Sequence, residues 1–181
     1  MNARQLMIRD FNLLVTTARG HEFDVCSEIW YLLTQIGDDS PRIDKTGVSG
    51  LISVRTAIPP QEAIRKLRGL LKGRPREFQF TLRVIPIQTV TETTLDSIKK
   101  AATELAGQIG IGETFRVTVE KRFSNLPTKE ITDVAASEIH RTVNLTNPEK
   151  ILLVEVVGKL TGMSIIEPDG ILSTSKERLV I

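Results

Sequence analysis

A run of basic side chains at residues 65–76 has the composition of a phosphate-binding surface. Its sequence is RKLRGLLKGRPR, which contains six Lys or Arg residues and no acidic residue. Basic side chains that neutralise the phosphates of a nucleic acid release counterions, so their contribution to affinity falls as salt rises. A solvated helix face whose leucines pack inward gives the same pattern. The run therefore predicts either a phosphate-binding track or an ordinary surface helix.

A second basic group lies at the end of residues 114–122, whose sequence is TFRVTVEKR. Apolar and polar residues alternate along this segment with the period of two that is typical of a strand. Lys121 and Arg122 follow where the strand passes into a helix, and Arg116 shares the parity of Arg122. Such junctions often carry functional residues. Arg can grip a phosphate with two hydrogen bonds, so these cations predict a second phosphate-binding position.

Residue types that commonly carry out catalysis or bind metals are scarce and scattered. The chain has one cysteine, Cys26, and two histidines, His21 and His140. Their positions match neither the ligand spacing of a zinc site nor a nucleophile paired with a base. We therefore predict no catalytic residue, no metal site and no cofactor, and a protein that is not an enzyme.

Aromatic side chains make up only 4% of the chain, and we expect most of them in the core. Stacking on aromatic rings is a common way to hold unpaired bases, and it has little support here beyond arginine. Recognition of shape and backbone, as with structured RNA, is the expectation that follows.

The bulk composition is that of a folded, soluble chain. Of 181 residues, 40% are apolar and 25% are charged, and the net charge is +2. A single cysteine favours a reducing compartment. The longest apolar run, residues 151–157, is interrupted by Glu155 and is far shorter than the roughly 20 residues of a membrane span. The first ten residues lack the apolar core of an export signal, so we expect a cytoplasmic protein without a membrane partner.

The first half of the chain predicts six elements in the order strand, helix, strand, strand, helix, strand. Their ranges are 11–17, 21–36, 42–46, 51–56, 59–73 and 78–85. This order is that of a ferredoxin-like domain, in which two helices cover one face of a four-stranded antiparallel sheet. The polar residues 88–94 mark the expected junction between domains.

The second half predicts a mixed α/β unit. Helices are expected at residues 94–109 and 128–143, and strands at 114–121, 151–157 and 163–167. The near-continuous apolar strand 151–157 follows a strand and a helix, so it is expected to pair parallel to 114–121. Residues 168–181 have no clear pattern. The fold class is therefore α/β, more closely α+β, with domains at residues 1–88 and 89–181.

Short motifs in a fixed order run through most of the chain. They are TARG at 17–20 with Glu22 and Glu28, RVIPI at 83–87, FRVTVEKR at 115–122, KEI at 129–131, NLTNPE at 144–149, VEVVG at 154–158 and TGMSI at 161–165. Together they resemble the THUMP-domain proteins, and among these the stand-alone type that assists cytidine acetylation of transfer RNA. One departure is Asn144, where the family commonly has Asp.

The resemblance implies a ferredoxin-like domain followed by a THUMP domain, a pairing that binds the acceptor end of transfer RNA. It further implies a non-catalytic adaptor that presents tRNA to a separate RNA acetyltransferase for N4-acetylcytidine formation, with no DNA partner. We expect one surface between the domains to bind RNA. The candidate RNA-binding residues are Arg116, Lys121, Arg122, Lys129, Arg83, Arg68, Lys72, Arg74 and Arg76.

Two alternatives remain open from the sequence. The second hypothesis is a tRNA-binding subunit for another modification, such as thiolation or methylation, whose catalytic chain is separate. Because ferredoxin-like domains also bind metabolites at paired interfaces, a small-molecule regulatory module is a less favoured interpretation.

Overall fold

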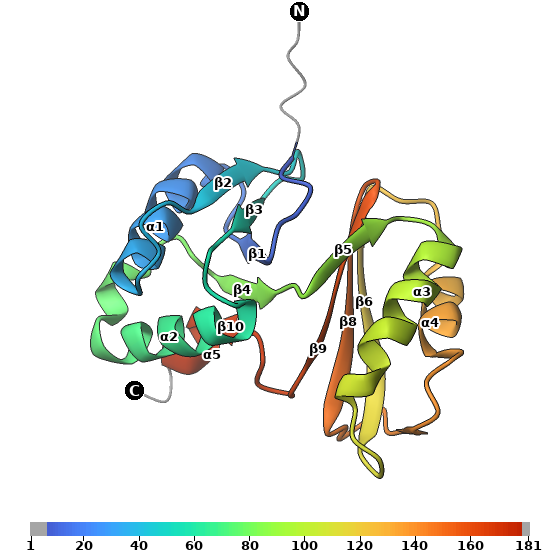
Figure 1. Cartoon of the computed structure of the whole chain (residues 1–181). Helices are drawn as coiled ribbons and strands as arrows, with labels where there is room; N and C mark the ends of the chain where they lie inside the picture. Colours follow the sequence, from blue (N-terminus) through green and yellow to red (C-terminus); the bar gives the residue numbers. More distant parts are fainter. Residues whose placement is uncertain (1–6, 179–181) are drawn as a thin grey trace, which may run out of the picture. The chain divides into compact units, whose positions relative to one another are not determined.

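The computed structural model describes residues 7–178 and divides the chain into two compact units, and Figure 1 labels most of their helices and strands. The first unit contains the residues up to Ile87 and those from Gly170 onward, and the second is Gln88–Asp169. Predictions that concern residues 1–6 and 179–181 fall outside the described residues. No helix within residues 7–178 is long and apolar enough to cross a membrane.

The first unit is an antiparallel five-stranded sheet with the order β10-β4-β1-β3-β2. Its elements are β1 (Leu13–Thr16), α1 (Glu22–Gln35), β2 (Arg42–Lys45), β3 (Leu51–Arg55), α2 (Pro60–Gly73), a 3₁₀ turn (Pro75–Glu77), β4 (Arg83–Pro86), β10 (Leu172–Ser173) and α5 (Thr174–Arg178). Strands β4, β1, β3 and β2 have the predicted ferredoxin-like order.

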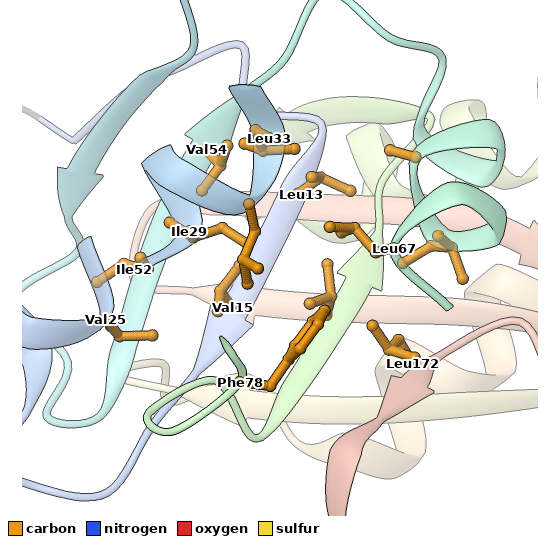
Figure 2. Packing of buried hydrophobic residues seen from close by; sticks show 14 of the residues in the cluster. Leu13, Val15, Val25, Ile29, Leu33, Ile52, Val54, Leu67, Phe78 and Leu172 are labelled. Carbon is orange, nitrogen blue, oxygen red and sulfur yellow. The ribbon is translucent and has the colours of Figure 1, made fainter. Parts of the chain in front are cut away.

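The core of the first unit lies between one face of this sheet and helices α1 and α2 (Figure 2). Alternate strand residues point into it because successive side chains of a strand face opposite sides. The helices contribute residues spaced by three and four, as an amphipathic helix requires. Figure 2 labels Val25, Ile29 and Leu33 of α1, Leu67 of α2, and Leu13, Val15, Ile52 and Val54 of strands β1 and β3, together with Phe78 and Leu172.

The C-terminal segment completes the first unit. Leu172 of β10 pairs with Val84 of β4, and its side chain is fully buried in the same core near Phe78 (Figure 2). Residues 168–181 had no predicted structure, because two-residue strands leave no detectable periodicity. Their position on the first sheet is set by long-range pairing.

The strand predicted at residues 78–85 is only partly correct, since β4 begins at Arg83. The N–H groups of residues 79–81 bind a side chain instead of a neighbouring strand. The Glu28 carboxylate of α1 accepts hydrogen bonds from the N–H groups of Gln79 (2.6 Å), Phe80 (3.1 Å) and Thr81 (2.7 Å). A carboxylate that binds three N–H groups holds them in a loop.

The second unit is a mixed sheet with the order β5-β9-β8-β6-β7, covered on one face by two helices. Its elements are β5 (Thr89–Glu92), α3 (Leu95–Leu105), a 3₁₀ turn (Ala106–Gln108), β6 (Thr114–Arg122), α4 (Thr128–Ala136), β7 (Thr142–Val143), β8 (Lys150–Val157) and β9 (Leu160–Ile166). The predicted parallel pairing of β6 with β8 and antiparallel pairing of β8 with β9 are confirmed.

Two predictions for the second unit are corrected. The polar junction at residues 88–94 contains β5, an edge strand paired with β9. The helix predicted at 128–143 ends at Ala136, and Thr142–Val143 forms β7 beside the start of β6. Arg141 holds this segment in place because its Nε donates to the carbonyls of Ile109 (3.2 Å) and Gly110 (3.0 Å).

Candidate nucleic-acid interface

The six cations of residues 65–76, here called the α2 basic group, differ in what they contact. Arg65 and Lys72 are seven residues apart, so they lie two turns apart on the face of α2 opposite the buried Leu67, and both are exposed. Arg76 is exposed in the 3₁₀ turn that follows. Within residues 7–178, these three cations have no acidic partner, whereas the other three of the group form ion pairs.

Arg68 is held between α2 and the C-terminal segment. Its Nε donates to the Glu177 carboxylate, and its Nη2 lies 3.4 Å from the carbonyl of Ile171. The second oxygen of Glu177 accepts from the N–H of Ser173 at 2.9 Å. Arg68 therefore links α2 to α5 and to the segment before β10. Its guanidinium is less available to a ligand than the side chains of Arg65 and Lys72 on the outer face of α2.

Lys66 and Arg74 flank a shallow hollow of about 400 Å³ on the first unit. Leu70 and Ile36 also line it, together with Gly69 and Gly73 of α2. Arg74 donates to the Gln35 amide oxygen at 3.0 Å, and Lys66 pairs with Glu62 at 3.1 Å. The lining of the hollow therefore combines apolar residues with two cations.

Helix α5 adds two cations that the sequence analysis missed. Lys176 and Arg178 are exposed, and α5 contacts α2. Arg178 donates through Nη2 to the carbonyls of Pro75, at 3.2 Å, and Phe78. Nothing local in the sequence marks these two residues, because they are more than 90 positions from α2.

Arg83 lies apart from the α2 basic group. Val84 points into the core shared with the helices, so strand alternation directs Arg83 to the opposite face of the sheet. The side chain of Arg83 is half-buried. The structure therefore places two of the predicted sets of RNA-binding residues on different faces of the first unit.

In the second unit, the carboxyl ends of the parallel strands β6 and β8 form what we call the β6 end: Lys121, Arg122, Phe123 and Lys159. Arg122 pairs with Val157 across the strands, and the N–H of Gly158 donates to the Arg122 carbonyl at 2.8 Å. Lys159 follows in the turn between β8 and β9. Lys121 and Lys159 are both exposed.

Arg122 neutralises a buried acid. Its Nη1 lies 2.8 Å from Oε2 of Glu155, whose side chain is only 2% exposed, while that of Arg122 is 18% exposed. A carboxylate removed from water requires an opposite charge and hydrogen bonds nearby. The charge of Arg122 is therefore used mainly within the sheet. Lys121 differs, because its Nζ donates to the neutral carbonyl of Leu126 at 2.8 Å and keeps its positive charge available.

The other two predicted cations of this unit, Lys129 and Arg116, do not belong to the β6 end, and each bonds a local partner. Lys129, in the first turn of α4, bonds Asp133 at 2.8 Å, and this contact raises the pKa of Lys129. Arg116 is six strand positions before Arg122, which is about 20 Å along the strand. Its Nη1 donates to the Leu145 carbonyl at 3.0 Å. Only Lys121 and Arg122 of the four predicted cations of this unit are adjacent.

The expectation that aromatic residues are mostly in the core is wrong for half of them. The chain has six Phe, one Trp and one Tyr. Four of these eight side chains are exposed: Phe23, Trp30, Tyr31 and Phe123. The first three lie on the outer face of α1, and Phe123 lies at the β6 end.

A family model for the THUMP domain matches residues 92–166. The chain contains a THUMP domain. The match runs from the last residue of β5 to the last residue of β9, so the domain lies within the second unit. In this THUMP domain, the side-chain oxygen of Asn144 accepts from the N–H groups of Thr146 (3.1 Å) and Asn147 (3.0 Å). An aspartate oxygen would accept the same bonds, which explains why Asn is tolerated there.

Solved structures with the same fold are larger than this chain, which spans about half of their length. PH1313 from Pyrococcus horikoshii Ot3 matches with a TM-score of 0.66 and 19% identity, over 87% of this chain and 55% of that one. TrmN from Thermus thermophilus matches with a TM-score of 0.54 and 16% identity, over 84% of this chain and 44% of that one. A 4-thiouridine synthetase, solved with RNA and ATP, matches with a TM-score of 0.50 and 15% identity, over 87% of this chain and 42% of that one.

These identities show a shared fold alone. No curated protein matches the sequence. Among residues 7–178, no group of three or more His, Cys, Asp or Glu side chains has the arrangement of a metal site.

Proposed function

We propose that this chain is a non-catalytic tRNA-binding adaptor that acts in tRNA modification. The observation that carries the proposal is the THUMP domain at residues 92–166, since a THUMP domain is an RNA-binding module. The exposed cations Arg65, Lys72 and Arg76 support it because they have no acidic partner within residues 7–178 and can neutralise phosphates.

The finer role follows from the motif resemblance. In this role, the chain recognises the acceptor stem and 3′ end of a tRNA in the cytoplasm. It presents the tRNA to a separate RNA acetyltransferase that forms N4-acetylcytidine. The motif FRVTVEKR at 115–122 contributes Lys121 to the RNA contact. Arg68 and Arg122 act through the fold, because each is bonded to a carboxylate of its own unit.

Binding itself is tested by measuring the affinity of the purified chain for tRNA over a series of salt concentrations. We expect log Kd to rise linearly with log salt, with a slope of about 0.7 to 0.9 for each phosphate contacted. A chain that shows no tRNA binding at low salt would overturn the proposal.

The modification is tested by mass spectrometry of tRNA nucleosides from a strain lacking the gene. We expect N4-acetylcytidine to disappear and to return when the gene is restored. Loss of a thiolated or methylated nucleoside, with acetylcytidine intact, would assign the adaptor to a different enzyme. An unchanged nucleoside profile would exclude a role in modification under the conditions tested.

A further inference from the structure

Phe123 combines two unfavourable features at one position. Its φ of 55° makes it the one non-glycine residue with positive φ within residues 7–178. Its side chain is 77% exposed. A bulky residue in the left-handed region is a rare outlier, because its Cβ lies too close to the following carbonyl.

The conformation is imposed by contacts on both sides of Phe123. On one side, the N–H of Gly158 donates to the Arg122 carbonyl at 2.8 Å and ends β6 at that residue. On the other side, Lys121 donates to the Leu126 carbonyl at 2.8 Å, and the Ser124 hydroxyl accepts from the Leu126 N–H at 3.3 Å.

The loop must also return the chain to the core. Leu126 packs against the hydrophobic cluster of the second unit, and α4 begins two residues later at Thr128. A sharp reversal over residues 123–127 meets this need, and glycine or asparagine would serve it without strain. The packing of the THUMP domain therefore explains the turn, and it does not explain why a phenylalanine occupies it.

The surroundings of Phe123 suit a strand of nucleic acid. Lys121 is two residues before it, and Lys159 is in the turn whose Gly158 binds the Arg122 backbone. Both lysines are exposed and within residues 7–178 have no acidic partner. An exposed aromatic ring with exposed lysines on neighbouring segments is an arrangement by which proteins hold unpaired nucleotides, since the ring can stack on a base and the lysines can contact phosphates.

We infer that Phe123 is a stacking platform for an unpaired nucleobase of the RNA that this chain binds, with Lys121 and Lys159 at the adjacent phosphates. The inference rests on the proposed function and extends it, because it assigns a base contact to a protein otherwise expected to read shape and backbone. A backbone fixed on both sides limits the directions in which the ring can point before RNA arrives, so less ordering is required on binding than in a flexible loop.

The test compares variants that separate ring, apolar surface and backbone strain. In tRNA binding by the full chain, we expect Phe123→Leu and Phe123→Gly to weaken affinity about tenfold, and Phe123→Trp to retain it. The salt slope should stay unchanged in all three, because no charge is removed. Phe123→Gly should unfold at the same or a higher temperature than the wild type, since glycine accepts positive φ. Its loss of binding then cannot be attributed to unfolding.

Phe23→Ala is the matched control, because Phe23 is 74% exposed on α1 of the first unit, and we expect it to bind tRNA as the wild type does. A direct readout is the aromatic NMR spectrum with and without tRNA. We expect the Phe123 ring signals, assigned by their absence in Phe123→Leu, to shift upfield when a base stacks on the ring.

The outcomes separate this inference from the proposed function. If the wild type binds tRNA and Phe123→Leu binds equally well, or only Phe123→Gly is weakened, stacking is excluded and tRNA binding stands. If the Phe123 variants bind tRNA normally but fail to support modification, the ring contacts a protein and the inference is wrong. If the wild type does not bind tRNA, the proposed function fails first.

Discussion

The α2 basic group and the β6 end offer different chemistry to a ligand. In the α2 basic group, Arg65, Lys72 and Arg76 are exposed cations without an acidic partner in the described residues, and residues 65–76 include no aromatic side chain. At the β6 end, Arg122 is bonded to a buried acid and an exposed aromatic ring lies beside it. The first surface therefore suits salt-dependent backbone binding, and the second suits contact with a base.

The comparison teaches that adjacent cations in a sequence need not share a role. Lys121 and Arg122 are neighbours on one strand, so their side chains point to opposite faces of the sheet. Lys121 reaches the loop before α4, and Arg122 reaches Glu155 on the other face. The variants below separate cations that stabilise the fold from cations that bind RNA.

The largest effect is expected for Arg122→Met. The change removes the guanidinium that bonds the buried Glu155 carboxylate, so we expect the free energy of unfolding to fall by about 3–5 kcal/mol. Urea denaturation measures this, and Arg122→Met/Glu155→Leu should recover most of the loss. A stable Arg122→Met protein with strongly reduced tRNA affinity would instead show that Arg122 contacts RNA. The β6 end and the α2 basic group would then both supply RNA-binding cations.

The next effect concerns charge on α2. We expect Arg65→Ala/Lys72→Ala to raise the Kd for tRNA about tenfold at low salt and to reduce the salt slope by about 1.5, which corresponds to two phosphates. Stability should be unchanged, because both side chains are exposed. The matched control is Lys99→Ala/Lys100→Ala on α3, which removes two exposed cations and should leave the slope as it is. If Arg65→Ala/Lys72→Ala keeps the same salt slope as the control, the exposed face of α2 is an ordinary solvated surface.

Arg68→Ala should affect stability more than binding. Arg68 bonds Glu177, which also accepts from the N–H of Ser173, so we expect unfolding to become easier by about 1 kcal/mol. Amide hydrogen exchange should become faster in β10 and α5, while the salt slope stays within error of the wild type. A lower slope with unchanged exchange would place Arg68 in the RNA contact.

The smallest effect is expected for Lys129→Ala, which should change tRNA affinity by less than about twofold. Lys129 is 87% exposed and paired with Asp133, and pairs of this kind contribute little. Asp133 raises the pKa of Lys129 above its usual 10.5, so the pair is intact at lower pH and is lost only as pH rises through that raised pKa. We therefore expect the same small effect at pH 6 and pH 9. A large loss of affinity would add α4 to the interface.

Local periodicity was sufficient to predict much of the fold. The alternation in Thr114–Arg122 and the apolar run of Lys150–Val157 predicted two strands and their parallel pairing, which the structure confirms. Local patterns failed at residues 78–82, because the Glu28 carboxylate, about 50 positions earlier, binds the N–H groups of residues 79–81. They also gave no structure for Leu172–Ser173, which depends on pairing with β4.

The candidate site was less predictable than the fold. The sequence marked Arg68 and Arg122 as free cations, since their acidic partners lie 109 and 33 positions away. It also gave no reason to single out Phe123, because exposure and a positive φ are properties of the folded chain. Lys159, by contrast, follows Gly158 in a short turn between two apolar strands, and this turn signal could have indicated an exposed cation.

The sequence by itself determined most of the longer helices and strands, the content of basic residues, and the order of motifs that resembles THUMP proteins. These depend on neighbours within a few positions, because side-chain periodicity is a local property. Only the tertiary structure decided which cations pair with acidic side chains of the protein and which aromatic side chains stay exposed to solvent. An ion pair or a buried side chain requires partners that are distant in sequence, and the packing of each unit determines which partners meet.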